Sequence, residues 1–373
     1  MLYEWLIRPL LFCLDAETSH HLALRTLATL NRSAALRRWL RRRRLPDDPR
    51  LQVTLFGQRL PHPVGLAAGF DKNGRVVPAL FALGFSFVEI GAVSGRPESG
   101  NPRPRIFRLP EHRSLLNRMG LPNEGAEVIA RRLASMPAPE GLLGANIVKA
   151  KSVPATSPEA IEEYARTFDL LFPSVHFFSI NISSPSSPDL RSLNAPADLR
   201  RLLGRLTEQN RRRAERDGAR PRALLLKISP DLSDGELDDV LGIATEMGLD
   251  GIVATNTTAA RPPVLAGVPL ASEAGGLSGA LLRERSTQVI RSIYQKTGGA
   301  LTILGVGGVF TAADVWEKLA AGASAVELYT GFVYEGPGIV GEMARGLSRL
   351  LDERKVRDLR ATIGSDAWPA PGV

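Results

Sequence analysis

Short apolar runs rich in β-branched residues recur along the chain from residue 63 onward. Each run has the length of a single strand and is apolar at almost every position, a pattern typical of strands buried on both faces of a parallel sheet. The eight runs occupy residues 63–70, 86–93, 142–148, 176–183, 223–229, 251–257, 301–308 and 325–331. Between most of them lie stretches with helical spacing, such as Ala160–Leu170, Asp234–Met247, Leu281–Gln295 and Ala312–Ala321. The chain is therefore predicted to alternate strands with helices.

Eight consecutive strand–helix units predict an α/β protein built as a closed (β/α)8 TIM barrel. A doubly wound open sheet is the alternative, since it uses the same alternation, but the unbroken series favours closure. We assign residues 46–355 to the barrel, 1–45 to an N-terminal helical extension and 356–373 to a C-terminal tail. The end of the tail, Ser365–Val373, contains two prolines and a glycine and is expected to be frayed.

The N-terminal extension is amphipathic rather than uniformly apolar. Arg8 and Pro9 interrupt its first apolar stretch, so that neither a signal peptide nor a membrane-spanning helix is expected. An apolar face followed by the basic run LRRWLRRRR (36–44) predicts a helix pair lying on a membrane surface. The alternative is a helical arm packed on the main domain or on a second subunit. The residues of this face are Leu2, Trp5, Leu6, Leu10, His20, Leu24 and Leu27.

Composition adds two constraints. The 373 residues are 44% hydrophobic and 23% charged, as in a soluble globular protein, and the single cysteine, Cys13, excludes an intrachain disulfide. The net charge of +8 is concentrated in two arginine-rich blocks, at 36–44 and 199–222. Such blocks suit phosphates of nucleic acid or anionic lipid, although a solvated helix face is the more common explanation.

Barrel enzymes gather their chemistry where the strands end, at the carboxyl face. The polar side chains expected at these ends are Asp71, Lys72, Asn146, Lys149, Asn181–Ser184, Lys227, Thr255–Thr257, Tyr329 and Thr330. Glycine-rich segments at 275–279, 305–309 and 329–332 lie where barrels commonly seat a phosphate. The dinucleotide-binding fingerprint of Rossmann folds is absent, so the sequence predicts a mononucleotide cofactor.

Asparagine offers a donor and an acceptor side by side and therefore suits the edge of a flat heterocycle such as a pyrimidine. Asn117, Asn146, Asn181 and Asn256 are candidates for this role, and turn formation is the alternative for each. Lys227 would lie beside the cofactor, where a positive charge stabilises a reduced flavin. Lys72 suits a substrate carboxylate or the carbonyl edge of a flavin. For both lysines, a packed stem with a solvated head is the alternative.

A series of motifs now resembles a known family. In chain order these are GLAAGFDKNG, NRMGLPNEG, INISSP, LKISPDLS, IVATNTT, GGLSG, GVGGV and ELYTGF. Over about residues 50–345 they resemble dihydroorotate dehydrogenase, and the N-terminal LFCLDAETSHHLAL is similar to the class 2, quinone-linked form. The resemblance implies oxidation of (S)-dihydroorotate to orotate in pyrimidine biosynthesis, with FMN reduced and then reoxidised by ubiquinone or menaquinone.

The same resemblance implies where the protein works. In the class 2 form, the N-terminal helices lie on the membrane and form the tunnel through which the quinone enters. We therefore expect a monomeric peripheral membrane protein, on the cytoplasmic face of the inner membrane if it is bacterial. No nucleic-acid partner and no metal site are expected.

The motif INISSP carries the expected catalytic residue. In this family a side chain on the loop after the fourth strand removes the C5 proton while hydride leaves C6 for the flavin. Class 1 enzymes use cysteine there and class 2 enzymes use serine, and the matching residue is Ser184. A hydroxyl is a poor base compared with a thiol of pKa about 8.5, so the proton is expected to pass onward through water.

The other roles implied by the resemblance carry over position by position. FMN is expected to contact Ala68, Gly69, Lys72, Ala92, Asn146, Asn181, Lys227, Thr255, Gly279, Gly308, Tyr329 and Thr330. The substrate is expected to meet Lys72, Asn117, Arg118, Met119, Gly120, Leu121, Asn181, Ser186, Asn256 and Thr257. The quinone tunnel is expected to be lined by His20, Arg108 and Tyr329.

The chain departs from the family pattern at several positions. Ser186 replaces an asparagine that bonds the substrate, and Asp189 replaces a glycine, which is expected to stiffen the loop or alter its turn. Ala92 replaces a threonine that touches FMN. Val148 and Ala150 replace the usual glycine and asparagine around a lysine. These changes affect substrate affinity and loop motion rather than the class of reaction.

Two alternatives of other kinds remain. The arginine blocks would suit a tRNA dihydrouridine synthase, a different flavin barrel, but that family uses a cysteine as its acid and no cysteine lies in the predicted barrel. A non-enzymatic basic or membrane-binding scaffold is the other, and a flavin spectrum in the purified protein would exclude it.

Overall fold

The computed structural model describes residues 3–155, 157–185 and 188–368. Within these residues, eight parallel strands close into a barrel in the order β10-β12-β13-β3-β4-β7-β8-β9. Pairing of β13 with β3 closes the ring, which confirms the (β/α)8 barrel and excludes the open sheet. Each predicted apolar run supplies one strand: β3 (Val64–Leu66), β4 (Phe87–Val93), β7 (Leu142–Ile147), β8 (Phe177–Asn181), β9 (Ala223–Ile228), β10 (Gly251–Ala254), β12 (Thr302–Val306) and β13 (Ala325–Leu328).

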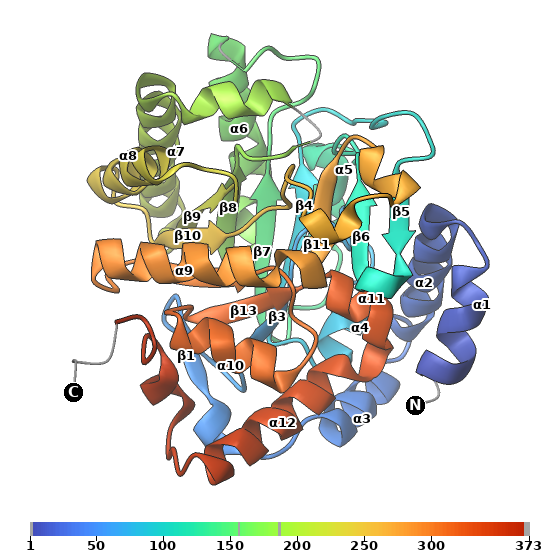
Figure 1. The fold of residues 1–373 in the computed structure, drawn as a ribbon. Helices are drawn as coiled ribbons and strands as arrows, with labels where there is room; N and C mark the ends of the chain where they lie inside the picture. Colours follow the sequence, from blue (N-terminus) through green and yellow to red (C-terminus); the bar gives the residue numbers. More distant parts are fainter. Residues whose placement is uncertain (1–2, 156, 186–187, 369–373) are drawn as a thin grey trace.

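Helices surround the barrel (Figure 1). They are α4 (Val77–Ala82), α5 (Ala126–Ala134), α6 (Pro158–Leu171), α7 (Pro196–Asp217), α8 (Asp234–Glu246), α9 (Arg283–Thr297), α10 (Ala312–Ala320), α11 (Thr330–Glu335) and α12 (Ile339–Glu353). The four stretches predicted from apolar spacing correspond to α6, α8, α9 and α10, with ends shifted by a few residues at most. Ser233 and Thr311 begin α8 and α10 with capping boxes, which satisfy the first amide groups of each helix.

Smaller elements complete the two ends of the barrel. The hairpin of β1 (Val53–Leu55) and β2 (Gln58–Leu60) packs its apolar side chains against the barrel interior. A separate antiparallel sheet contains β5 (Ile106–Leu109), β6 (Ser114–Asn117) and β11 (Gly276–Gly279). Short helical turns are η2 (Pro49–Leu51), η3 (Pro110–His112), η4 (Phe172–Ser174), η5 (Pro188–Asn194), η6 (Pro263–Leu265), η7 (Pro269–Ser272), η8 (Ala280–Leu282), η9 (Gly336–Gly338) and η10 (Leu359–Thr362).

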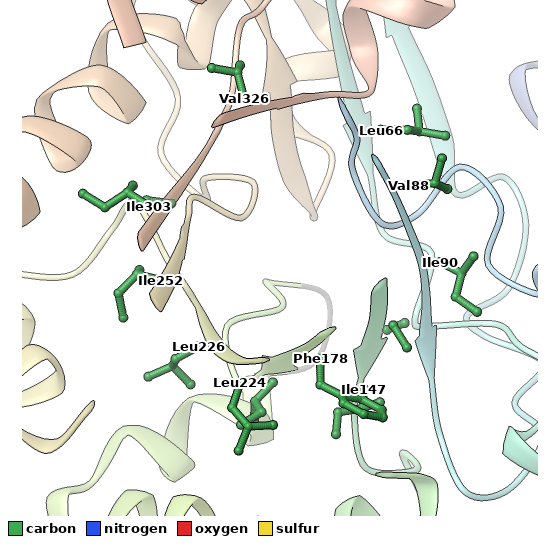
Figure 2. Packing of buried hydrophobic residues seen from close by; sticks show 14 of the residues in the cluster. Leu66, Val88, Ile90, Ile147, Phe178, Leu224, Leu226, Ile252, Ile303 and Val326 are labelled. Atoms are coloured by element: carbon green, nitrogen blue, oxygen red, sulfur yellow. The ribbon is translucent and has the colours of Figure 1, made fainter. Parts of the chain in front are cut away.

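Side chains along each barrel strand alternate between the outer core and the interior, as the pleat of a strand requires. Figure 2 shows Val88, Ile90 and Leu226 pointing outward, toward the helices. Their neighbours Glu89 and Lys227 therefore point into the barrel. Alternation thus decides which polar residues of an apolar strand meet inside.

Near the amino-terminal ends of the strands, the interior of the barrel is filled by apolar side chains. Phe87 and Phe177 pack there with Leu225 and the hairpin. A Cβ atom on Gly65 would lie 2.4 Å from the ring of Phe87, and one on Gly144 would lie 2.1 Å from the ring of Phe177. These two glycines make room for the two rings, which fill the barrel at the amino-terminal ends of its strands. Polar interior groups can therefore be reached only from the carboxyl end of the strands.

The N-terminal segment consists of η1 (Tyr3–Ile7), α1 (Arg8–Phe12), α2 (Ala16–Leu30) and α3 (Ala34–Arg44). It lies against the barrel beside α4 and α12 (Figure 1). Glu17 on α2 forms an ion pair with Arg105, and the two oxygens of its carboxylate accept bonds of 2.7 and 3.1 Å. Both side chains are only 8% exposed. The segment is thus a helical arm packed on the main domain, one of the two possibilities that the sequence left open.

The outer face of this segment remains apolar. Most of the large exposed hydrophobic side chains among the described residues lie here: Trp5, Leu6, Ile7, Leu10, Leu14, Leu22, Leu36 and Trp39. Trp5 is 81% exposed. No helix in the described part of the chain has both the length and the apolar character needed to cross a membrane.

The arginine-rich blocks are mostly engaged with the protein itself. On α7, Arg211 and Arg212 both pair with Glu208, and Arg205 pairs with Glu162 on α6. This is the solvated helix face that was considered the more common explanation. In the first block, three arginines donate to backbone carbonyl groups: Arg37 to Asn31, Arg41 to Phe81 and Arg44 to Pro337.

The prediction of a frayed C-terminal tail is wrong for its described part. The amide of Gly364 donates to the carbonyl of Leu319, and that of Asp366 to the carbonyl of Ala320, both at 2.9 Å. Leu359 and Ala367 are buried. The amide groups of the segment bond to carbonyl groups at the end of α10. The proline and glycine content of the tail does not reveal this tertiary contact. Residues 369–373 lie outside the described residues.

The buried pair predicts what anchors the N-terminal arm. In Glu17→Ala the guanidinium of Arg105 stays buried without its partner, which costs about 3–5 kcal/mol. We expect faster hydrogen exchange in α2 and a lower thermal unfolding midpoint. Glu208→Ala, which removes exposed pairs on α7, is the control and should change stability by less than about 1 kcal/mol. Equal stability of the two variants would contradict the anchoring role.

Candidate active site

A cavity opens at the carboxyl ends of the barrel strands. It is lined by residues from the ends of the barrel strands together with residues of β5, β6 and β11. All twelve positions expected to contact FMN lie in this lining: Ala68, Gly69, Lys72, Ala92, Asn146, Asn181, Lys227, Thr255, Gly279, Gly308, Tyr329 and Thr330. Ser184 and Pro185 line it as well. The fold therefore gathers around one space residues as far apart in the chain as Ala68 and Thr330, as barrel closure requires.

Most of the expected substrate positions line the same cavity. They are Lys72, Asn117, Met119, Leu121, Asn181, Asn256 and Thr257. Arg118 and Gly120 do not line it. Arg118 lies over the ring of Phe107 at 4.8 Å and pairs with Glu273. Ser186 lies outside the described residues. The individual roles of all these residues stay predictions.

Two buried carboxylates, Glu89 and Glu327, were missed by the sequence analysis. Glu89 is fully buried and accepts bonds from the amide of Ala68 (3.0 Å), from Asn146 Nδ2 (3.1 Å) and from Lys227 Nζ (3.3 Å). Glu327, also fully buried, lines the cavity. Each is a single acid inside an otherwise apolar strand, FVEIGAV and AVEL. A lone acidic residue in an apolar strand is the sequence feature that could have identified them.

A chain of amide bonds fixes the asparagines. Asn181 Nδ2 donates to Asn146 Oδ1 at 3.0 Å, and Asn256 Nδ2 donates to Ser183 Oγ at 3.1 Å. Ser183 Oγ donates in turn to the carbonyl of Lys227 at 2.8 Å. Because each amide already has a fixed partner, the orientation of its remaining donor or acceptor is set before a ligand arrives.

The glycine-rich side of the cavity suits a phosphate group. Gly308 has φ +69°, and a Cβ atom there would lie 2.3 Å from Arg283 Cβ. Gly279 has φ +99°, and its Cβ would lie 2.5 Å from the carbonyl oxygen of Arg113. Only glycine fits these positions, so bare backbone faces the cavity. Ser278 and Thr330 add hydroxyl groups, 2.9 Å apart. The residues present therefore fit a phosphorylated flavin.

Lys72 supplies positive charge to the cavity. Its Nζ donates to the carbonyl of Gly69 at 2.5 Å. Burial, and next the positive charge of Arg105, lower the pKa of Lys72 to about 8, while Glu17 and Asp71 act in the opposite direction. Lys72 thus carries its charge at neutral pH and loses it under mildly alkaline conditions.

A second cavity lies between α2 and the loops of the barrel, and Lys72 and Met119 line both cavities. His20 lines the second one and meets Phe70 edge to face at 5.1 Å. Phe70 meets Tyr329 of the first cavity at 6.1 Å. Burial lowers the pKa of His20 to about 3, so its ring is neutral.

Arg108 lines neither cavity. Its guanidinium donates to the carbonyl of Leu14 at 2.6 Å and to Ser19 Oγ at 2.8 Å, and it lies 4.5 Å from the ring of Phe12. It holds the α1–α2 turn against β5. Its expected part in a quinone tunnel stays a prediction.

The loop after β8 is held by a charge pair. Asp189 Oδ2 lies 2.7 Å from Nζ of the buried Lys149 and accepts the amide of Ala155 at 3.0 Å. The expectation that Asp189 stiffens this loop agrees with these contacts. Ser184, on the same loop, is only 5% exposed. The one cysteine, Cys13, lies exposed in the N-terminal segment, so no thiol reaches the cavity.

Comparison with known proteins gives a consistent result. A family model described as dihydroorotate dehydrogenase matches residues 50–351. Relatives named dihydroorotate dehydrogenase (quinone) include one from Myxococcus xanthus, 48% identical over 97% of both chains, and one from Chloroflexus aurantiacus, 47% identical over 90% of this chain and 93% of that one. The crystal structure of DHODH from Eimeria tenella in complex with ferulenol superposes with a TM-score of 0.84, at 32% identity over 95% of this chain and 96% of that one. This chain belongs to the dihydroorotate dehydrogenase family.

Proposed function

We propose that this protein oxidises (S)-dihydroorotate to orotate in pyrimidine biosynthesis and passes the two electrons through FMN to a membrane quinone. The observation that carries the proposal is the cavity in which Ser184 lies among the asparagines, lysines and glycines expected for this chemistry. The names of the relatives support it. A tRNA dihydrouridine synthase is not favoured, because no relative reported above bears that name and the barrel contains no cysteine.

The residues of the cavity would divide the work between cofactor and substrate. Gly279, Gly308 and Thr330 would hold the phosphate of FMN, and Lys227 would hold the flavin ring. When bound, FMN supplies the acceptor for the two electrons of the oxidation. Lys72 would bind the substrate carboxylate by charge, and the fixed asparagine amides would bind the edges of the pyrimidine ring.

Ser184 would take the proton from C5 of the substrate. A serine hydroxyl has little basicity of its own, so it must pass the proton on as it accepts it. Among the described residues that line the cavity there is no histidine and no thiol to receive it. We therefore infer that water carries the proton away, with the buried loop holding Ser184 in position.

The N-terminal segment would bring the protein to its second substrate. Its exposed apolar side chains, Trp5 and Leu10 among them, support a peripheral position on a membrane surface. The protein would act there as a monomer, on the cytoplasmic face of the inner membrane if it is bacterial. The rings of His20, Phe70 and Tyr329 connect the second cavity with the first, which supports a quinone path between them. Ubiquinone or menaquinone would be the quinone that uses this path.

The serine assignment has a direct kinetic test. In Ser184→Ala the proton acceptor is lost while the ring-binding groups stay, so flavin reduction by dihydroorotate should slow by roughly 10²–10⁴-fold. Stopped-flow absorbance of the bound flavin measures this rate. Orotate binding, followed by the same spectrum, should stay close to wild type. Reduction at the wild-type rate would remove Ser184 from its role.

The charge of Lys72 predicts a pH dependence. As the pH rises through about 8, Lys72 loses its proton and its attraction for the substrate carboxylate, so KM for dihydroorotate should increase. Lys72→Arg keeps a positive charge over this whole range and should flatten the rise. Steady-state assays between pH 6.5 and about 9.5, the upper end lying well below the pKa of arginine, provide the comparison. A KM that rises equally in both proteins would exclude Lys72 as the cause.

Membrane contact can be tested without disturbing the fold. The double variant Trp5→Glu, Leu10→Glu should bind lipid vesicles at least tenfold more weakly, since each buried apolar side chain contributes on the order of 1.5–3 kcal/mol. Vesicle sedimentation measures the binding. Val264→Glu with Trp368→Glu, both 57% exposed elsewhere, is the matched control. Equal binding by the two double variants would contradict a membrane face on the N-terminal segment.

A further inference from the structure

Glu327 lies one residue before the end of β13 and has no role in the function proposed so far. Its neighbour Val326 points outward (Figure 2), so Glu327 points into the barrel. It is fully buried, yet it lines the main cavity. A carboxyl group in such a place must be either neutral or compensated by charge.

Within the part of the chain that the structure describes, the surroundings of Glu327 provide no hydrogen-bond donor. Neither of its carboxylate oxygens accepts a hydrogen bond from a donor group of the described residues. Its side chain faces that of Glu89, whose Oε2 accepts from the amide of Ala68 and from Lys227 and whose Oε1 accepts from Asn146, so that Oε1 can still accept one more hydrogen bond. Two carboxyl groups that face each other without a donor between them require one shared proton. Glu89, with three donors, is the partner that carries the negative charge.

The charge balance leads to the same assignment. Glu89 on β4 and Lys227 on β9 are the charged groups that act on Glu327 from across the barrel. On the adjoining strands, β12 and β3, the residues paired with Glu327 are Val306 and Gly65, which do not titrate. One lysine can neutralise only one of the two carboxylates. With both ionised, this layer would carry a net charge of −1 in the interior.

Other titratable groups near the cavity do not change this balance. Tyr329 follows β13, and burial raises its pKa to about 12, so it is neutral. Lys72 lines the same cavity, where its Nζ donates to the carbonyl of Gly69. On α10, outside the barrel wall, Lys318 is fully buried and bonds to Ser286 and Thr287. Burial first, and then the charge of Glu89, raise the pKa of Glu327 well above its usual value.

We propose that Glu327 is a positioning residue that keeps its proton and shares it with Glu89, so that the charge around Lys227 depends on whether this proton is present. With the proton, the three groups sum to zero. When it leaves to solvent through the cavity at higher pH, they sum to −1, and the positive charge of Lys227 is offset. As far as the cofactor is concerned, this inference depends on the proposed function: loss of the proton would make reduction of a bound flavin less favourable.

The first test uses the protein without cofactor. Glu327 binds its proton more tightly in the folded than in the unfolded state, so above pH about 4.5 the folded protein loses stability as the pH rises. Glu327→Gln has the same shape and no proton to lose. The unfolding midpoint of the variant minus that of wild type should therefore grow as the pH is raised from about 5 to about 9, because only wild type has a buried carboxyl group that can lose its proton. A margin that is constant with pH would overturn the proposal.

The second test uses the protein loaded with FMN. The two-electron reduction potential should fall more steeply with pH in wild type than in Glu327→Gln. A tenfold change in the relative affinity for reduced and oxidised flavin corresponds to about 30 mV, and we expect a difference of at least this size at alkaline pH. If the reduction potentials of the two proteins fall equally with pH, the proposed effect on the cofactor is wrong. The shared proton would still be supported if the difference in unfolding midpoint depends on pH.

A matched control separates this site from burial in general. Glu163 on α6 is also buried, with a pKa raised mainly by burial, but it does not line the cavity. Glu163→Gln should change the pH dependence of stability and leave that of the potential as in wild type. An equal effect of Glu163→Gln on the potential would contradict the proposal. A wild-type protein that binds no flavin would defeat the proposed function, whereas the unfolding test would still decide the shared proton.

Discussion

The ion pair between Glu89 and Lys227 is the interaction on which the interior of the barrel depends. Two charges 3.3 Å apart lie almost completely out of reach of solvent, between a closed apolar layer and the cavity. Buried charges are tolerated only when they are paired and hydrogen-bonded. Here the amide of Ala68 and the side chain of Asn146 complete the pair. The strand ends of β3, β4, β7 and β9 are thereby held in one register around the cavity.

This polar layer also determines what the cavity can do. Asn146 links the ion pair to Asn181, and Ser183 links the Lys227 backbone to Asn256, so the groups available to a ligand are oriented from below. A pre-oriented polar site costs little reorganisation when a reaction occurs. Glu327 lies in this layer without a donor, and its protonation decides whether the layer is neutral. The same buried polar residues therefore hold the strand ends together, orient the groups that bind a ligand and determine how the site responds to pH.

The N-terminal arm is also held by a buried ion pair, here at the outside of the barrel. Glu17 reaches the buried Arg105, which also bonds the carbonyl groups of Ser99 and Asn101. The arm is thereby fixed next to the main cavity, and its His20 contacts Phe70. Its inner face is committed to the barrel, and its outer face keeps exposed apolar side chains such as Trp5 and Leu10. One amphipathic segment can in this way serve both the protein and a surface.

The eight strands and four of the helices around the barrel were predictable, because the periodicity of apolar residues is a local feature of the chain. Most of the predicted site residues line one cavity. Asn146 and Tyr329 could be assigned to one site as soon as barrel closure was assumed, whereas Ala68 was implied only by the family resemblance. The packing of Ala367 and the position of Arg118 could not, because each depends on a partner distant in the chain.

What the sequence determined by itself was therefore the order of the elements and the chemistry available at their ends. Which of these groups meet, and in what charge state, was decided only by the tertiary structure. Glu89 and Glu327 are 238 residues apart, each a lone acid in an apolar strand. Closure of the barrel brings them face to face beside a single lysine. Because burial excludes water as an alternative partner, a carboxylate without a hydrogen-bond donor is costly there, and Glu327 is expected to keep its proton.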